Sequence, residues 1–143
     1  MNNLTKMKIS KPVQEVFKAF VDSSKIGNFW FSSSSADWEQ GTAITLRYDE
    51  YDAQADIVVK EIELNRKIVF NWGTNGKGRP VTITLNPTDH GECIIKIIEE
   101  GFDVSDPDMI PQMLDNKEGW VYMLTCLKGY LEYGVNLRAA LVK

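Results

Sequence analysis

The stretch "EGWVYMLTCLKGYLEYG", residues 118–134, decides the fold. Its apolar residues recur at the spacing of an α-helix, so we predict one long helix from about Pro111 to Gly134. The main apolar stripe comprises Trp120, Leu124, Leu127, Leu131 and Val135, and Met123 and Tyr130 widen it. A second stripe beside it comprises Tyr122, Cys126, Gly129 and Tyr133.

These two stripes leave little of the helix for water. The positions that remain on the outside are Val121, Thr125, Lys128 and Glu132. The apolar arc is wider than the ~100° that a surface helix needs. We therefore expect other elements to cover this helix on more than one side.

Upstream of the helix the apolar period changes from 3.6 to two, which is typical of strands. The strand-like segments span residues 42–48, 53–64, 67–72, 81–87 and 92–100, with turn residues between them. They are spaced as hairpins and predict an antiparallel meander. The segment 53–64 is long enough for a β-bulge. A curved sheet of this kind would cover the broad helical stripe.

The N-terminal part predicts one more strand and two short helices. Residues 5–9 read as the strand, and 10–20 carry Val13, Val16, Phe17 and Phe20 at helical spacing after a proline. Residues 22–29 predict a second short helix that Gly27 ends. The predicted fold class is α+β: about six antiparallel strands curve around a long C-terminal helix, in one domain spanning 1–143.

This order of elements resembles the START-like superfamily, also called SRPBCC or helix-grip, and within it the activator of heat-shock-protein-90 ATPase family. The stretches that carry the resemblance are "SKPVQEVFKAF" (10–20), "IGNFWF" (26–31), "VVKEIELNRKIVFNW" (58–72) and "EGWVYMLTCLKGYLEYG" (118–134). The resemblance implies a hydrophobic cavity between the sheet and the long helix. Superfamily members bind lipids, polyketides, hormones or flavonoids there, and some catalyse cyclisation or hydrolysis.

Large apolar side chains on the concave face and on the helix are the candidates for lining this cavity. They are Phe17, Phe20, Trp30, Phe31, Ile44, Leu46, Tyr48, Phe70, Trp72, Ile83, Leu85, Trp120, Met123, Leu124 and Leu127. Trp30, Trp72 and Trp120 are the sharpest candidates, although aromatic residues also fill ordinary cores. The hydroxyls of Tyr48 and Tyr122 would orient a ligand, because binding sites combine apolar walls with few polar groups.

The serine run 32–35 lies between aromatic clusters and raises the question of a nucleophile. A serine nucleophile needs an oriented base, and the sole histidine, His90, lies in a distant turn. We therefore predict the lip of a cavity here and no catalytic residue. His90 alone cannot build a zinc site, and the acidic stretch 103–108 lacks the glycine of a calcium loop. We predict no metal and no cofactor.

Charge and composition narrow the partners. The chain has 143 residues and a net charge of −4, which disfavours nucleic acid as a partner because phosphate backbones attract basic surfaces. The apolar runs are too short for membrane insertion, and the N-terminus lacks a signal sequence. We expect a cytoplasmic protein whose Cys93 and Cys126 are free thiols.

The leading functional hypothesis is a protein that binds a small hydrophobic molecule in an internal cavity. One alternative is a co-chaperone-like module that modulates a heat-shock-protein-90 ATPase, and another is a cyclase or hydrolase acting in the cavity. The small residues Cys126 and Gly129 allow a close approach by another element. That element is either a short N-terminal helix or a second copy of the chain in a homodimer.

Overall fold

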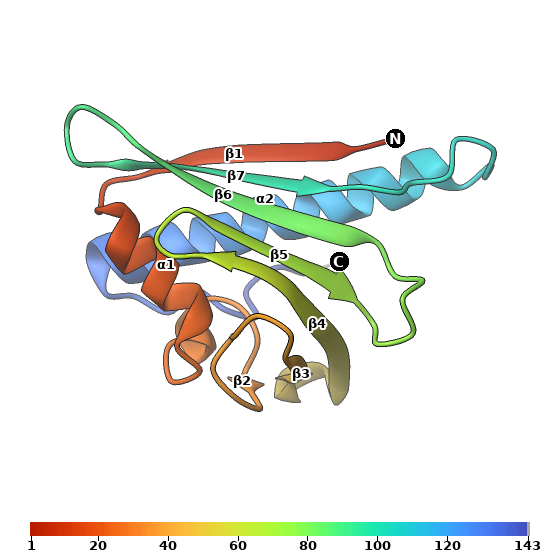
Figure 1. The fold of residues 1–143 in the computed structure, drawn as a ribbon, viewed down its shortest axis with the longest axis horizontal. Helices are drawn as coiled ribbons and strands as arrows, with labels where there is room; N and C mark the ends of the chain where they lie inside the picture. Colours follow the sequence, from red (N-terminus) through yellow and green to blue (C-terminus); the bar gives the residue numbers. More distant parts are fainter. Residues whose placement is uncertain (143) are drawn as a thin grey trace.

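The computed structural model of the chain describes residues 1–142 and shows an antiparallel sheet that curves along a long C-terminal helix (Figure 1). The seven strands lie in the order β1-β7-β6-β5-β4-β3-β2. The strands are β1 Asn3–Ile9, β2 Ser33–Ser34, β3 Ala43–Tyr48, β4 Ala53–Glu63, β5 Lys67–Trp72, β6 Pro80–Pro87 and β7 Cys93–Glu99. The helices are α1 Val13–Val21, the 3₁₀ turns η1 Ile26–Asn28 and η2 Asp49–Tyr51, and α2 Met109–Tyr133.

The long helix α2 is confirmed, and it ends at Gly134, as predicted. Gly134 has a φ of 67°, a conformation that glycine adopts at little cost. Its amide donates a hydrogen bond to the Tyr130 carbonyl. Val135 therefore lies beyond the helix and is 45% exposed, and Tyr133 is 73% exposed. Both stripes end earlier than predicted, because Tyr133 faces outward and the helix stops before Val135.

The meander from β3 to β7 is confirmed, with every neighbouring pair antiparallel. The bulge expected in 53–64 is present as a register shift between Val59 and Glu61 on β4. The count of strands was one too low. The seventh strand is β2, which the serine run forms by pairing Ser33 with Arg47 and Ser34 with Leu46.

Helix α1 is confirmed, whereas the second short helix was wrong. Residues 26–28 form a single 3₁₀ turn, and Gly27 lies inside it rather than at its end. A Cβ atom on Gly27 would lie 2.8 Å from the Ser32 carbonyl oxygen. The glycine is therefore needed for the close approach of the chain that follows, and it does not act as a helix stop.

The core lies between the concave face of the sheet and the two α-helices. Its largest fully buried side chains include Phe20, Phe29, Phe70, Ile83 and Leu85. Aromatic edges close the packing, with Phe20 and Phe29 ring centroids 5.3 Å apart. Within residues 1–142, none of the helices has the length and apolar character that a membrane span requires. Beside the middle of α2 the packing leaves two pockets.

Candidate ligand-binding site

Two adjoining pockets, here called the first lobe and the second lobe, lie where α2 faces the end of β3. Their volumes are about 520 Å³ and 250 Å³. Trp30, Tyr48 and Gly119 line both lobes. The rest of the first lobe is lined by Phe29, Tyr51, Tyr122, Met123, Arg138, Ala139 and Leu141. The rest of the second lobe is lined by Phe31, Trp72, Asp115, Asn116 and Trp120.

Gly119 is the reason that α2 leaves space here. A Cβ atom at this position would meet no neighbouring atom within 4 Å. The next residue, Trp120, is buried against the core. The missing side chain thus opens the helix surface to both lobes without loosening the packing beside it.

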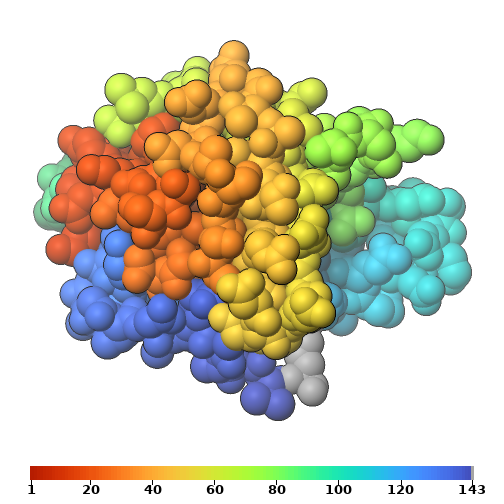
Figure 2. Space-filling view, turned by 90° about the horizontal axis from the view of Figure 1, so that it is seen from below, coloured from red at the N-terminus to blue at the C-terminus, as the bar shows by residue number. Residues whose placement is uncertain are grey.

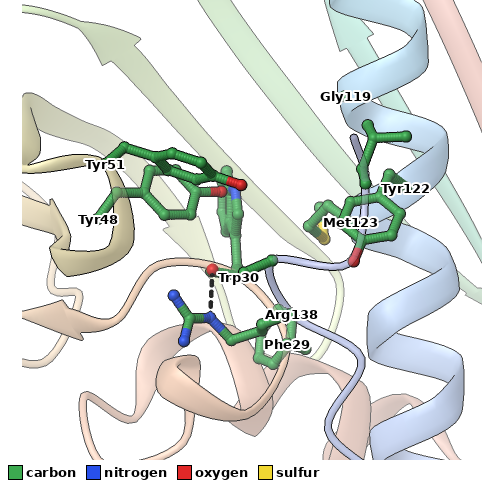
Figure 3. A pocket seen from close by; sticks show the side chains of 10 residues that line it. Phe29, Trp30, Tyr48, Tyr51, Gly119, Tyr122, Met123 and Arg138 are labelled. Carbon is green, nitrogen blue, oxygen red and sulfur yellow. Dashed lines mark hydrogen bonds between the residues drawn. The ribbon is translucent and has the colours of Figure 1, made fainter. Parts of the chain in front are cut away.

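Tyrosines from three elements face each other across the first lobe (Figure 3). Tyr48 at the end of β3 and Tyr51 in η2 lie on one side, and Tyr122 and Met123 of α2 lie on the other. Burial raises the pKa of Tyr48 to about 12. Its hydroxyl therefore stays protonated at neutral pH and is suited to hydrogen bonding.

Arg138 closes the first lobe by tying the C-terminal tail, residues 135–142, to the opposite wall. Its Nε donates to the Trp30 carbonyl over 2.7 Å (Figure 3). Its Nη1 lies 2.8 Å from a Glu50 carboxylate oxygen, and its Nη2 donates to the Ser32 hydroxyl over 3.0 Å. Figure 2 shows the tail in dark blue against the yellow segment that contains Glu50. The arginine hydrogen bond lowers the pKa of Glu50, which keeps this pair charged.

Tyr122 holds the same tail from the helix side. Its hydroxyl donates to the Leu137 carbonyl and accepts a hydrogen bond from the Ala140 amide, over 2.8 Å in the second case. Burial raises the pKa of Tyr122. The tail is therefore fixed at both sides of the first lobe and forms one of its walls.

In the second lobe, two tryptophans are held by one buried carboxylate. Glu99 of β7 is fully buried. Its Oε1 accepts the indole N–H of Trp72 over 3.1 Å and that of Trp120 over 3.2 Å. The same oxygen accepts the Asn116 amide over 3.0 Å. Three donors on one oxygen fix the orientation of both indoles.

The charge of Glu99 is balanced on its other oxygen. Arg79 Nε donates to Oε2 over 2.7 Å, and the guanidinium lies 4.2 Å from the centre of the Phe102 ring. A buried carboxylate is tolerated where a cation and hydrogen bonds compensate its lost hydration. This cluster therefore fixes the aromatic wall of the second lobe, and Arg79 compensates the charge of the buried Glu99 carboxylate.

Six of the fifteen predicted cavity residues line the lobes. They are Trp30, Phe31, Tyr48, Trp72, Trp120 and Met123. The other nine are buried in the packed core: Phe17, Phe20, Ile44, Leu46, Phe70, Ile83, Leu85, Leu124 and Leu127. These nine lie where sheet and helices meet directly, so their side chains fill the space that a larger cavity would need. Their part in binding stays a prediction.

The serine run has a structural role at the lip. Ser35 pairs with Thr45 through its amide and its hydroxyl, and Ser34 donates to the Ala36 carbonyl. The Ser32 hydroxyl accepts the Asp49 amide over 2.8 Å. The flanking aromatics Phe29, Trp30, Phe31 and Trp38 are all buried. The hydroxyls thus fasten a short edge strand above an aromatic wall.

The face of α2 around Cys126 and Gly129 is covered from within the chain. A Cβ atom on Gly129 would lie 2.9 Å from Leu137 and 3.2 Å from Val135, both in the tail. Cys93 and Cys126 are free thiols, as predicted, and both are buried. Neither element proposed for this face, a short N-terminal helix or a second copy, is needed to bury Gly129.

Sequence reasoning missed the tail side chains, Tyr51 and Glu99. Tyr51 was assigned to a turn, and the residues after Val135 carried no periodic signal. Within residues 1–142, no group of three histidine, cysteine, aspartate or glutamate side chains is placed to hold a metal ion. The chemistry that the lobes offer is aromatic stacking, tyrosine hydroxyls and a few charged groups.

Comparison with known proteins finds a family and solved structures that match most of the chain. The family described as "Activator of Hsp90 ATPase homolog 1-like protein" matches residues 10–132. No curated protein matches the chain. A crystal structure of the protein SSP2350 from Staphylococcus saprophyticus is 49% identical, with a TM-score of 0.85 and 96% of each chain covered.

Two more distant structures share the fold. The Aha1 dimer from Colwellia psychrerythraea is 16% identical with a TM-score of 0.81, and the match covers 94% of this chain and 98% of that one. DynU16, a putative protein of the dynemicin biosynthetic locus, is 22% identical with a TM-score of 0.79. That match covers 94% of this chain and 48% of DynU16.

Proposed function

The chain belongs to the family of activator of Hsp90 ATPase homolog 1-like proteins, and we propose that it binds a small hydrophobic molecule in the two lobes beside α2. The observation that carries the proposal is the room left at Gly119 between walls of tryptophan and tyrosine. The first lobe, at about 520 Å³, falls within the range of small-molecule sites, roughly 300–1,000 Å³.

The polar groups of the lobes support a ligand that is mostly apolar. The Tyr48 hydroxyl stays protonated, and Arg138 already has partners on Nε, Nη1 and Nη2. An apolar ligand would gain about 25 cal/mol for each Å² of apolar surface that it buries, less the cost of ordering. Tyr48 and Tyr51 would add hydrogen bonds that set its orientation.

Native mass spectrometry after expression, followed by dye displacement with fatty acids and aromatic compounds, tests this proposal. We expect displacement at micromolar concentrations, and weaker displacement in Tyr51→Ala, which removes one wall of the first lobe. Tyr133→Ala is the matched control, since Tyr133 lies on α2 outside both lobes. Absence of binding across the whole panel would count against a ligand-binding role.

A second candidate function is modulation of a heat-shock-protein-90 ATPase, and the family match is the observation that favours it. The test is a pull-down with the host's heat-shock-protein-90 homologue, followed by an ATPase assay with the purified pair. Stimulation that depends on the concentration of this chain would support the role. An unchanged ATPase rate at saturating concentration would remove it.

An enzyme acting in the lobes would need a group that gains or loses a proton there. The raised pKa values of Tyr48 and Tyr122 make these hydroxyls weaker acids than a free tyrosine, so they suit hydrogen-bond donation rather than proton transfer at neutral pH. A cyclase or hydrolase stays an alternative in which the Tyr48 hydroxyl donates a hydrogen bond to the substrate. Turnover of a bound ester or polyketide-like compound that is lost in Tyr48→Phe would support it.

A homodimer also stays a prediction. The Colwellia psychrerythraea structure is described as a dimer. For this chain the measurement is sedimentation equilibrium over a hundredfold range of concentration. A single species at the 16.2 kDa of one chain would rule out a stable homodimer.

A further inference from the structure

We infer that the second lobe selects an organic ammonium cation, such as a trimethylammonium group on an apolar body. The inference rests on the proposed function, because it specifies the ligand class of the same site. It is carried by three features of this lobe: its aromatic rings, the carboxylate behind two of them, and the charges that line it.

Five aromatic side chains line the second lobe, namely Trp30, Phe31, Tyr48, Trp72 and Trp120. They form a continuous wall, with ring centroids 4.9 Å apart for Trp30–Phe31, 4.4 Å for Phe31–Tyr48 and 5.5 Å for Trp30–Trp120. The face of an aromatic ring carries negative electrostatic potential and attracts cations. Several rings around one small lobe add their potentials.

Glu99 strengthens this potential at two of the rings. The N–H edge is the positive end of an indole, and both Trp72 and Trp120 direct that edge to the Glu99 carboxylate rather than into the lobe. The positive edges of these two indoles are therefore engaged outside the lobe, and tryptophan is the ring type that binds cations best.

The charges around the lobe have the matching sign. Asp115 is on its rim, and among its lining residues, all in the described part of the chain, there is no lysine or arginine. Arg79 is on the other side of Glu99, bonded to Oε2 and stacked on Phe102. Arg138 lines the first lobe and is neutralised by Glu50 at 2.8 Å.

A neutral ligand would use the aromatic wall but not the negative charge of Asp115 on the rim. The two lobes share Trp30, Tyr48 and Gly119, so a ligand with its ammonium group in the second lobe extends its apolar part into the first. This arrangement uses both halves of the site. We therefore expect the site to bind a cationic ligand more tightly than a neutral ligand of the same shape.

The test compares two probes of the same shape, (3-hydroxyphenyl)trimethylammonium and 3-tert-butylphenol, which differ by one positive charge. Calorimetric titration of the wild-type chain should give roughly tenfold tighter binding of the cation. Asp115→Asn should weaken binding of the cation several-fold and leave binding of the phenol unchanged, since it removes the charge and keeps the size of the side chain. Asp89→Asn, in the exposed turn between β6 and β7, is the matched control and should change neither affinity.

Placement in the lobe is tested by nuclear Overhauser contacts from the trimethylammonium methyls to the indole rings of Trp72 and Trp120. Contacts to these rings support the inference, and contacts elsewhere contradict it. Equal or tighter binding of the phenol by the wild-type chain overturns charge selection but leaves the proposed hydrophobic binding intact. Failure of both probes while other panel compounds bind overturns the inference alone, and failure of the entire panel overturns both.

Discussion

Two glycines on α2, Gly119 and Gly129, sit in opposite surroundings. A Cβ atom on Gly129 would press against Leu137 at 2.9 Å and Val135 at 3.2 Å, whereas one on Gly119 would meet nothing within 4 Å. The C-terminal tail covers Gly129. The same tail then continues past Gly119 and forms a wall of the first lobe. A small residue therefore allows close packing at one point and leaves a void at the other.

The contrast shows that the site depends on what the tail covers. Up to Leu137 the tail packs directly on α2, and the Arg138 side chain then reaches the Trp30 and Glu50 side. The filled region and the open region are thus neighbours on one helix. The following predictions test this division, beginning with the largest expected effect.

Truncating an aromatic ring should cost far more in the filled region than at the open one. Phe70 is fully buried and its ring contacts Trp30, Trp38 and Trp72, so Phe70→Ala should lower the free energy of unfolding by about 4 kcal/mol. Tyr51 is 58% exposed, and Tyr51→Ala should cost under about 1 kcal/mol. Urea denaturation measures both, and equal losses would contradict the division.

Replacing each glycine by alanine compares the two positions directly. Gly119→Ala should raise the free energy of unfolding by about 0.5–1 kcal/mol, because alanine favours the helix and finds open space. At Gly129 the same gain is offset by the displacement of Val135 and Leu137. We expect Gly129→Ala to be less stable than Gly119→Ala by roughly 1–2 kcal/mol. The reverse order in thermal and urea unfolding would show that the tail does not cover Gly129.

High pH should destabilise the chain through Tyr48 at the open region. Its folded pKa of about 12 is above the model-peptide value of 10.0, so the folded state holds the proton more tightly. The stability from this group is complete below pH 10 and is lost as the pH rises towards 12. Tyr48→Phe should therefore lose less stability than wild type over this interval. Parallel curves for the two proteins would mean that Tyr48 is not desolvated.

Acid should loosen the tail locally, which is the smallest effect. The pKa of Glu50 is below its usual 4.5 because Arg138 donates to it, so the tail contact is retained above that pH and weakens as the pH falls through the lowered value. Hydrogen exchange after acid equilibration should show loss of protection at residues 137–141 before the core strands change. Glu50→Gln should show the loosening already at neutral pH, and unchanged protection in that variant would contradict the contact.

Most of the fold could be predicted from local patterns. Alternation in 67–72 and 81–87 and the helical spacing after residue 111 depend on burial of one face, which the sequence displays directly. The 3₁₀ turn at Ile26–Asn28 was missed because the chain folds back on Gly27 at Ser32, which helical spacing does not reveal. The strand at Ser33–Ser34 was missed because it forms by pairing with Leu46 and Arg47 of β3.

The site was less predictable for a related reason. Alternation identifies the side chains that point inward, but it does not show which of them pack against other side chains and which face a pocket. Ile83 and Leu85 in the core therefore have the same pattern as Trp72 at the second lobe. Glu99 also lies in an apolar strand where nothing local indicates that it binds two indoles. Arg138 reaches Trp30 across 108 positions of the chain, a contact that no local pattern encodes.

The central claim is that the space at Gly119 is a binding site, and Gly119→Leu tests it most directly. Leucine is a better helix former than glycine, its Cβ atom would meet no neighbour within 4 Å, and its side chain would project into the space that both lobes share at this position. In a titration with a ligand identified by dye displacement, we predict unchanged or higher thermal stability and loss of binding by at least about tenfold. Wild-type affinity in a folded Gly119→Leu variant would contradict the account.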